Sequence, residues 1–161
     1  ENMRTVCEQY GIAYFIIRPF SVYGPFVGVP QVVLEIISQL KTGSNKIVLG
    51  NLDPRRDFIH VFDAADALAL LLDHGAPGAV YNLGANVSNS IREVAEITTA
   101  LLKSVGREIK FISDESRFRG GLERARLVGD DSKIMKELGW KPKIPLREGL
   151  VITLRAEGLL K

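Results

Sequence analysis

The sequence is poor in residues that form covalent cross-links or metal sites. It contains one cysteine, Cys7, which excludes an internal disulfide and any multi-cysteine metal site. Its two histidines, His60 and His74, stand far apart, and this argues against a histidine-based zinc site. Cys7 falls within an amphipathic helical pattern, so we expect its thiol to be buried and unreactive.

Long apolar runs and a charge excess are also missing. No run approaches the roughly 20 residues of a membrane span, and no signal peptide opens the chain. With 21 basic and 19 acidic residues, the net charge of +2 gives no sign of a nucleic-acid-binding surface. These features predict a cytoplasmic protein with neither a membrane nor a nucleic-acid partner. The first four residues fall inside a helical pattern without a start methionine or an N-cap, which predicts a piece of a longer protein.

Hydrophobic residues make up 46% of the 161 residues, enough for a core in one domain or in one large part of a two-domain enzyme. Short apolar runs predict strands at 13–17, 46–49, 79–83 and 109–112, and an alternating pattern predicts one at 57–61. Helical spacing predicts helices at 1–10, 31–40, 63–72, 90–103, 132–138 and 146–160. The run at 13–17, ended by Arg18-Pro19, is typical of a strand buried on both faces of a parallel sheet. Alternation of strands and helices predicts an α/β fold.

Several polar and aromatic residues are best explained by local structure. Ser90 and Glu93 have the spacing of a capping box at a helix start. Asp63 and Asp66 suggest acid–base chemistry at first sight, but a helix N-cap and a first-turn charge explain them better. Trp140 is expected to be a hydrophobic plug before Pro142.

Four motifs, in this order and spacing, carry a family resemblance. They are Arg18-Pro19-Phe20-Ser21-Val22-Tyr23-Gly24-Pro25, the stretch from Gly50 to Val61 (GNLDPRRDFIHV), Tyr81-Asn82-Leu83-Gly84 and Leu138-Gly139-Trp140-Lys141-Pro142. Together they make the chain resemble the second half of the extended short-chain dehydrogenase/reductase family. The members are NAD-dependent epimerases and dehydratases of nucleotide sugars. The resemblance covers nearly the whole chain.

The resemblance implies a Rossmann domain in the first half of the enzyme, with a glycine-rich loop and a catalytic Tyr-x-x-x-Lys pair. The sequence holds neither feature, so the chain alone is expected to be inactive and NAD or NADP to be bound mainly by the missing half. Pro19 and Phe20 match the turn beneath the nicotinamide and are the predicted cofactor contacts. A plain structural turn is the alternative. Ser21 stands where many members have a substrate-binding asparagine.

The predicted substrate-binding residues are Ser21, Val48, Leu49, Arg56 and Arg119. Arg56 matches the family arginine that contacts the diphosphate, and its planar fork suits that ligand better than an ammonium does. A surface ion pair with Asp53 or Asp57 is the alternative.

Two further predictions accompany this set. Arg55 is expected to face solvent. Val48 and Leu49 lie on a strand edge that, by resemblance, meets the base and ribose through main-chain groups. A plain core strand is the alternative explanation of Val48.

The resemblance implies a second phosphate-binding arginine about ten residues before Gly129-Asp130. Arg117 and Arg119 both fit, and Arg119 is preferred; a solvated loop is the alternative. Residues 1–28 and about 57–85 are assigned to the Rossmann side. The substrate-binding region then comprises about 29–56 and 86–161.

The resemblance further implies a homodimer in the complete enzyme. It leaves the base and the sugar open, between a UDP-glucose 4-epimerase type and a GDP-mannose 4,6-dehydratase or reductase type. A non-catalytic nucleotide-sugar-binding or regulatory module is the competing hypothesis.

Overall fold

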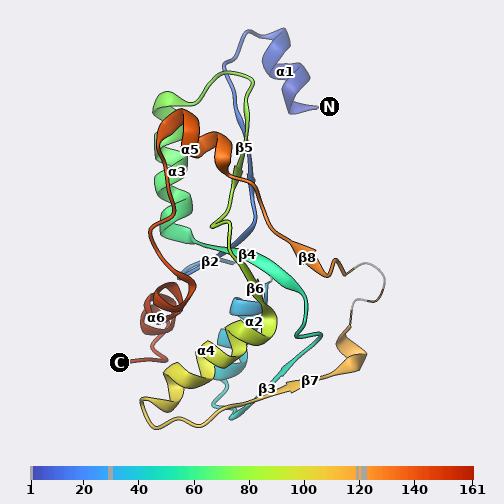
Figure 1. Cartoon of the computed structure of the whole chain (residues 1–161), viewed down its shortest axis with the longest axis vertical. Coiled ribbons are helices and arrows are strands. Elements are labelled where there is room, and N and C mark those ends of the chain that lie inside the picture. Colours follow the sequence, from blue (N-terminus) through green and yellow to red (C-terminus); the bar gives the residue numbers. More distant parts are fainter. Residues whose placement is uncertain (1, 29–30, 119, 121–122) are drawn as a thin grey trace.

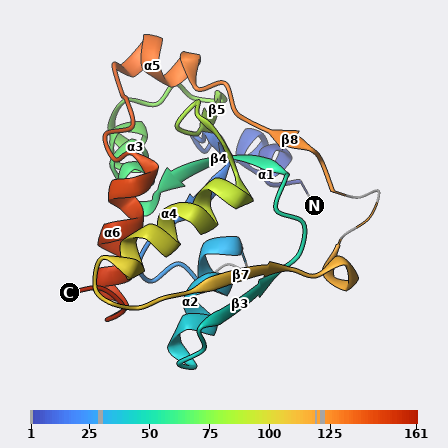
Figure 2. The same ribbon diagram turned by 60° about the horizontal axis from the view of Figure 1, so that its bottom comes forward.

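The computed structural model describes residues 2–28, 31–118, 120 and 123–161 (Figure 1). One end of the molecule carries α1 (Met3–Gln9), α3 (Val61–His74) and α5 (Ser132–Leu138) beside two strands, β1 (Ile16–Pro19) and β5 (Val80–Leu83). The other end carries α2 (Val32–Lys41), α4 (Ile91–Lys103) and a second strand pair, as Figure 2 also shows. Helices and strands alternate along the chain, which confirms the α/β prediction.

The strands form three small sheets in the part of the chain that the structure describes. β1 pairs in parallel with β5, with Ile16 opposite Val80. Strand β4 (Arg55–His60) lies at the centre of the second sheet and pairs with β2 (Ser21–Tyr23), β6 (Ser88–Ser90) and β8 (Arg126–Leu127). Of these partners, only β6 is antiparallel. The third sheet pairs β3 (Lys46–Leu49) in parallel with β7 (Lys110–Ser113).

Two apolar clusters stabilise the fold. The larger joins α2, β3, α4 and the last helix, α6 (Leu146–Ala156), around residues such as Ile36 and Leu102. The smaller packs α3, β5 and α5 around Tyr81 and includes Trp140, which is buried as predicted. Burying apolar surface of this kind is the main favourable contribution to folding.

Local cap chemistry explains where several helices begin. Ser90 and Glu93 form the predicted capping box of α4, with both reciprocal bonds present. Asn2 accepts a hydrogen bond from the Arg4 N–H and caps α1, so the expectation of an uncapped start is wrong. Cys7 is buried, as predicted. No described helix is long and apolar enough to cross a membrane.

The predicted strand at 13–17 is displaced. β1 spans Ile16–Pro19, and its residues are half-buried or exposed, so the prediction of burial on both faces is wrong. Among the described residues, the strand that pairs with β1 is β5 alone, and proline is tolerated on such an edge because its missing N–H faces away from the partner.

Asp63 is not the N-cap of α3. The helix begins at Val61, and the imidazole of His60 accepts the capping bond from the Phe62 N–H at 3.3 Å. The buried Asp63 carboxylate instead accepts the backbone N–H groups of Lys143 and Ile144 at 3.0 and 2.9 Å. Asp63 therefore has a structural role, as expected, but in hydrogen bonds to residues 143–144 rather than as the cap of α3.

Candidate nucleotide-binding cavity

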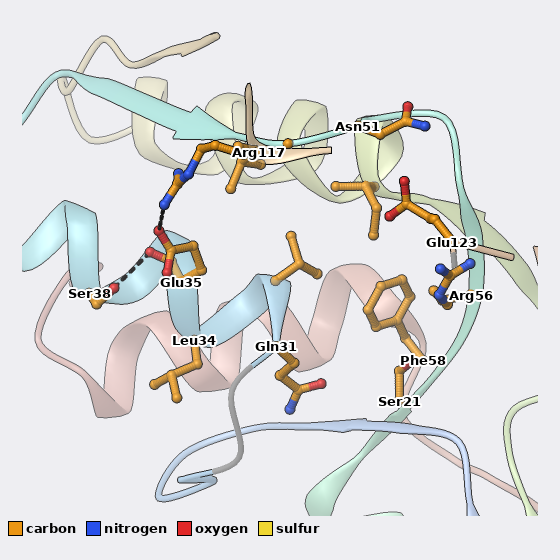
Figure 3. A pocket seen from close by; sticks show the side chains of 14 residues that line it. Ser21, Gln31, Leu34, Glu35, Ser38, Asn51, Arg56, Phe58, Arg117 and Glu123 are labelled. Carbon is orange, nitrogen blue, oxygen red and sulfur yellow. Dashed lines mark hydrogen bonds and ion pairs between the residues drawn. The ribbon is translucent and has the colours of Figure 1, made fainter. Parts of the chain in front are cut away.

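A cavity of about 660 Å³ opens between α2, the end of β3, β4 and a short 3₁₀ turn, η1 (Glu115–Arg117) (Figure 3). This volume is in the range of small-molecule sites. The polar side chains that line it are Ser21, Gln31, Glu35, Ser38, Asn51, Arg56, Arg117 and Glu123. The lining therefore offers hydrogen-bond donors and charges of both signs to a polar ligand.

Helix α2 forms one wall of this cavity. Its apolar stripe, which includes Ile36 and Leu40, is buried in the larger cluster. The helical period then turns Leu34, Glu35 and Ser38 toward the opening, as Figure 3 shows. The sequence that buries the helix thereby also fixes which polar groups face the cavity.

The free edge of β3 is covered by side chains. The Gln39 amide donates to the Val48 carbonyl and accepts from the Val48 N–H, both at 2.8 Å. Arg117 Nη1 also donates to the Val48 carbonyl. The main-chain groups of Val48, expected to meet a base, are thus already hydrogen-bonded within the protein. Leu49 is buried and lines the cavity, and its predicted ligand contact stays a prediction.

Arg117 and Glu35 form an ion pair at this end of the cavity. Arg117 Nη2 lies 3.2 Å from Glu35 Oε1, and both side chains are about two-fifths exposed. Oε1 also accepts from Gln39 Nε2 at 2.6 Å. A Cβ added at Gly50 would lie only 2.9 Å from the Arg117 carbonyl oxygen. The glycine therefore lets the η1 turn approach β3 closely enough for Arg117 to reach Val48.

Arg56 lies at the opposite end of the cavity, on β4. Its Nη1 donates to the carbonyl oxygens of Arg55 and Arg124, at 2.9 and 2.8 Å. Asp53 pairs with Arg92 instead, and Asp57 accepts backbone N–H groups, so neither predicted alternative partner holds Arg56 among the described residues. The hydrogen bonds described for Arg56 use Nη1 alone.

Arg55 was expected to face solvent. Its side chain is partly exposed but also bound, since Nε donates to Ser88 Oγ at 2.9 Å and Nη2 pairs with Glu93 at 3.1 Å. These contacts connect β4 to β6 and to the start of α4. The adjacent arginines therefore point to different surroundings, as alternation along a strand requires.

Ser21 lines the cavity, whereas the predicted cofactor contacts do not. Pro19 ends β1, and Phe20 lies between β1 and β2. The Phe20 N–H donates to the Leu83 carbonyl oxygen at 2.9 Å, and the Phe20 carbonyl oxygen accepts from the Val22 N–H at 3.0 Å. A Cβ at Gly129 would lie 2.3 Å from the Phe20 ring. Arg119, the preferred second phosphate ligand, lies outside the described residues.

Asp57 lies where three of the sequence motifs meet. From the sequence, it was expected only as a possible ion-pair partner of Arg56. Its fully buried carboxylate accepts the backbone N–H of Ala85 at 2.7 Å and of Gly129 at 3.1 Å. A Cβ added at Gly84 would lie 2.2 Å from one of its oxygens. The Asp-Phe, Asn-Leu-Gly and Gly-Asp motifs thus meet at one carboxylate.

The buried His60 lies next to two aromatic rings, those of Tyr23 and Phe62. The His60 ring lies 5.4 Å from that of Tyr23, edge to face, and Tyr23 packs in the same way against Phe58. Burial raises the pKa of the Tyr23 phenol, and the nearby Asp63 charge adds to this rise. Burial lowers the pKa of His60, against a smaller opposing effect of Asp63. The lowered pKa favours the neutral imidazole, in which Nδ1 accepts from the Phe62 N–H and Nε2 carries the proton.

The described residues include no group of three or more His, Cys, Asp or Glu side chains that could hold a metal ion. The sequence has no G-x-G-x-x-G turn, and both backbone groups of Phe20 are hydrogen-bonded within the protein. The predicted cofactor contacts of Pro19 and Phe20 stay predictions.

Comparison with known proteins places this arrangement in a class. The chain is 31% identical to the GDP-6-deoxy-D-mannose reductase of Pseudomonas aeruginosa, over 91% of this chain and 50% of that protein. It is 34% identical to the probable GDP-L-fucose synthase 1 of rice (Oryza sativa subsp. japonica), over 91% of this chain and 45% of that protein. The chain spans about half the length of the curated relatives it matches.

Solved structures agree with this placement. RMD from Pseudomonas aeruginosa, complexed with NADPH, superposes with a TM-score of 0.79 at 29% identity, over 95% of this chain and 52% of that one. The dTDP-glucose 4,6-dehydratase of Bacillus anthracis, in complex with NAD, gives 0.77 at 26% identity, over 96% of this chain and 47% of that one.

These matches define the class as the extended short-chain dehydrogenases/reductases, the NAD-dependent epimerases and dehydratases, which confirms the resemblance. NAD(P) is the cofactor of this class. Within the class, the chain belongs to the GDP-mannose 4,6 dehydratase family, whose model matches residues 1–153.

Proposed function

We propose that this chain is the nucleotide-sugar-binding part of an NAD(P)-dependent epimerase, dehydratase or reductase. The cavity takes the nucleotide sugar, and Arg56 binds its diphosphate. The observation that carries this proposal is the position of Arg56 on the cavity wall, with its described hydrogen bonds confined to Nη1. The N–H donors of this guanidinium on Nε and Nη2 remain for a diphosphate, which carries two negative charges.

Other parts of the cavity support the same assignment. Ser21 lies on the strand beside β4, opposite Phe58, where it faces the same opening as Arg56 (Figure 3). Relatives named for GDP-linked and for dTDP-linked sugars both match the chain, so their names leave the base open. The division of the chain into a Rossmann side and a substrate side also remains a proposal, as does a homodimer of the complete enzyme.

The test is calorimetry with a nucleoside diphosphate alone, which carries the phosphates without the sugar. Arg56→Ala should weaken binding by roughly ten- to a hundredfold, because a charge-assisted hydrogen bond contributes about 1.5–3 kcal/mol. Arg56→Lys should recover only part of the loss, since lysine keeps the charge without the fork.

Arg92→Ala is the matched control. It removes an arginine from an exposed pair with Asp53, and it should leave diphosphate affinity unchanged. If Arg56→Ala binds the ligand as tightly as the parent chain, the diphosphate assignment fails. Arg56 would then serve only to hold the carbonyls of Arg55 and Arg124.

A further inference from the structure

Two buried carboxyl groups lie close together where β4, the loop between β5 and β6, and the start of α5 meet. Asp57 of β4 is fully buried and accepts the N–H groups of Ala85 and Gly129. Asp131 is 1% exposed, and its Oδ1 accepts from the side-chain amide of Asn86. Both carboxyl groups therefore lie between the same two segments, residues 84–86 and 129–131.

The two carboxyl groups differ in their hydrogen bonds. Each oxygen of Asp57 accepts one backbone N–H, and such donors stabilise the ionised form. Oδ2 of Asp131 is buried and has no partner in the described part of the chain. Asp131 is the N-cap residue of α5, but its side chain accepts no N–H of that helix. An ionised Asp131 would thus keep a charged oxygen unsatisfied in the interior, which is unfavourable.

The surroundings of Asp131 supply negative charge. In the described residues, neither Asp57 nor Asp131 takes part in an ion pair. Lys133 of α5 lies over a tyrosine ring, and Lys136 acts on the exposed carboxylate of Asp130. Burial raises the pKa of Asp131, and the charges of Asp57 and Asp130 add to this rise, against the opposing effect of hydrogen bonds to Asp131.

We propose that the Asp131–Asn86 contact is a pH-sensitive latch, which holds the loop between β5 and β6 against the start of α5 while Asp131 is protonated and loosens when Asp131 loses its proton to solvent. In the protonated form Oδ1 still accepts from Asn86, and Oδ2 carries no charge. Asn86 has a φ of 55°, a left-handed conformation that asparagine adopts more readily than most residues, so its side chain is presented from a tight turn.

The latch is connected to the wall of the cavity. Strand β8 leads directly into Gly129 and Asp131, and the Arg124 carbonyl just before β8 holds Arg56. Loosening the junction therefore frees one end of the segment on which Arg56 rests. This connection does not depend on which ligand the cavity takes.

The sign of the pH dependence follows from the direction of the shift. The folded chain binds the Asp131 proton more readily than the unfolded chain does. The contribution of Asp131 to the free energy of unfolding should therefore be fully present below the ordinary aspartate pKa of about 3.9, and it should be lost as the pH rises through the folded pKa. Asparagine has nearly the same shape and does not ionise, so Asp131→Asn should remove this loss.

The experiment compares urea midpoints of the parent chain and Asp131→Asn at about pH 4 and about pH 7.5. The two midpoints should be close at the lower pH. At the higher pH the variant should exceed the parent by about 0.5 M or more, because it has no buried charge to leave unsatisfied. Asp130→Asn is the matched control. Its exposed carboxylate accepts from the Ser132 N–H, and its removal should raise the midpoint at neither pH.

Hydrogen exchange separates a latch from a merely structural contact. The amide protection factors of Ala85 and Gly129, which are corrected for the intrinsic effect of pH on exchange, should fall several-fold in the parent chain between about pH 5 and about pH 8. In Asp131→Asn they should stay constant. Protection that Asp131→Asn changes equally at both pH values would show a structural role alone and overturn the latch.

Two further results would contradict the proposal. Carboxyl carbon NMR of the parent chain needs no variant, and Asp131 should titrate at a higher pH than the exposed Asp53; a titration at or below that of Asp53 would overturn the latch. Stabilisation of the parent by NaCl or KCl over choline chloride at equal ionic strength, abolished in Asp131→Asn, would replace the proton at this place by a bound cation.

Discussion

Asp57→Ala offers the sharpest test of what holds the cavity in place. The Asp57 carboxylate is fully buried and accepts two backbone N–H groups, from Ala85 and Gly129. Alanine would leave both N–H groups without this partner, and an unsatisfied buried donor costs about 1–3 kcal/mol. We expect a loss of about 3 kcal/mol in the free energy of unfolding, since two donors are affected and part of the carboxylate's own desolvation cost is relieved.

The assay is urea denaturation followed by circular dichroism. For a chain of this size the urea dependence is about 2 kcal/mol per M, so the midpoint should fall by about 1.5 M. Asp53→Ala is the matched control, because Asp53 is largely exposed and makes only a surface pair with Arg92. That change should shift stability by less than about 1 kcal/mol. If the two variants have the same midpoint, the reasoning about Asp57 is refuted.

Two further predictions concern pH and turnover. Burial lowers the pKa of His60, so the unfolded chain binds the proton more readily than the folded chain does. The contribution of His60 to the free energy of unfolding should therefore be fully present above the ordinary histidine pKa of about 6.5 and should decline as the pH falls below it. His60→Asn, which keeps a capping acceptor without titrating, should flatten this part of a pH series of urea midpoints, while His74→Asn at an exposed site should not. A slope unchanged by His60→Asn would contradict the assignment. The purified 161-residue chain should convert no nucleotide sugar, because it has no Tyr-x-x-x-Lys pair; product formation in a coupled NAD(P)H assay would refute this.

Elements with a clear local signal were predictable from the sequence. Helix α2 follows from its apolar spacing, and the start of α4 follows from Ser90 and Glu93, because period and cap chemistry depend on neighbours within a few residues. The strand at 13–17 was displaced because composition does not reveal pairing partners. β1 has one partner, β5, and that choice depends on residues more than sixty positions away.

Of the predicted substrate-binding residues, Ser21, Leu49 and Arg56 line one cavity, and their contacts with a ligand stay predictions. The Glu35–Arg117 pair was not foreseen, since its members are 82 positions apart and meet only because η1 packs against Gly50. Asp57 was passed over as a structural residue because a carboxylate beside two arginines suggests an ion pair. Its partners are backbone N–H groups, which leave no mark in a sequence.

The alternation of β4 separates the proposed diphosphate contact from a structural residue within two adjacent positions. Arg56 and Asp57 follow each other on one strand, so their side chains leave it on opposite faces. One lines the cavity, and the other is buried against the glycines of two motifs. Substitutions at the two positions should therefore have different signatures: at Arg56, loss of diphosphate affinity with a fall in the urea midpoint smaller than that of Asp57→Ala, and at Asp57, loss of stability. Two adjacent residues of one motif can in this way combine a proposed ligand contact with the structural residue that holds the strand in place.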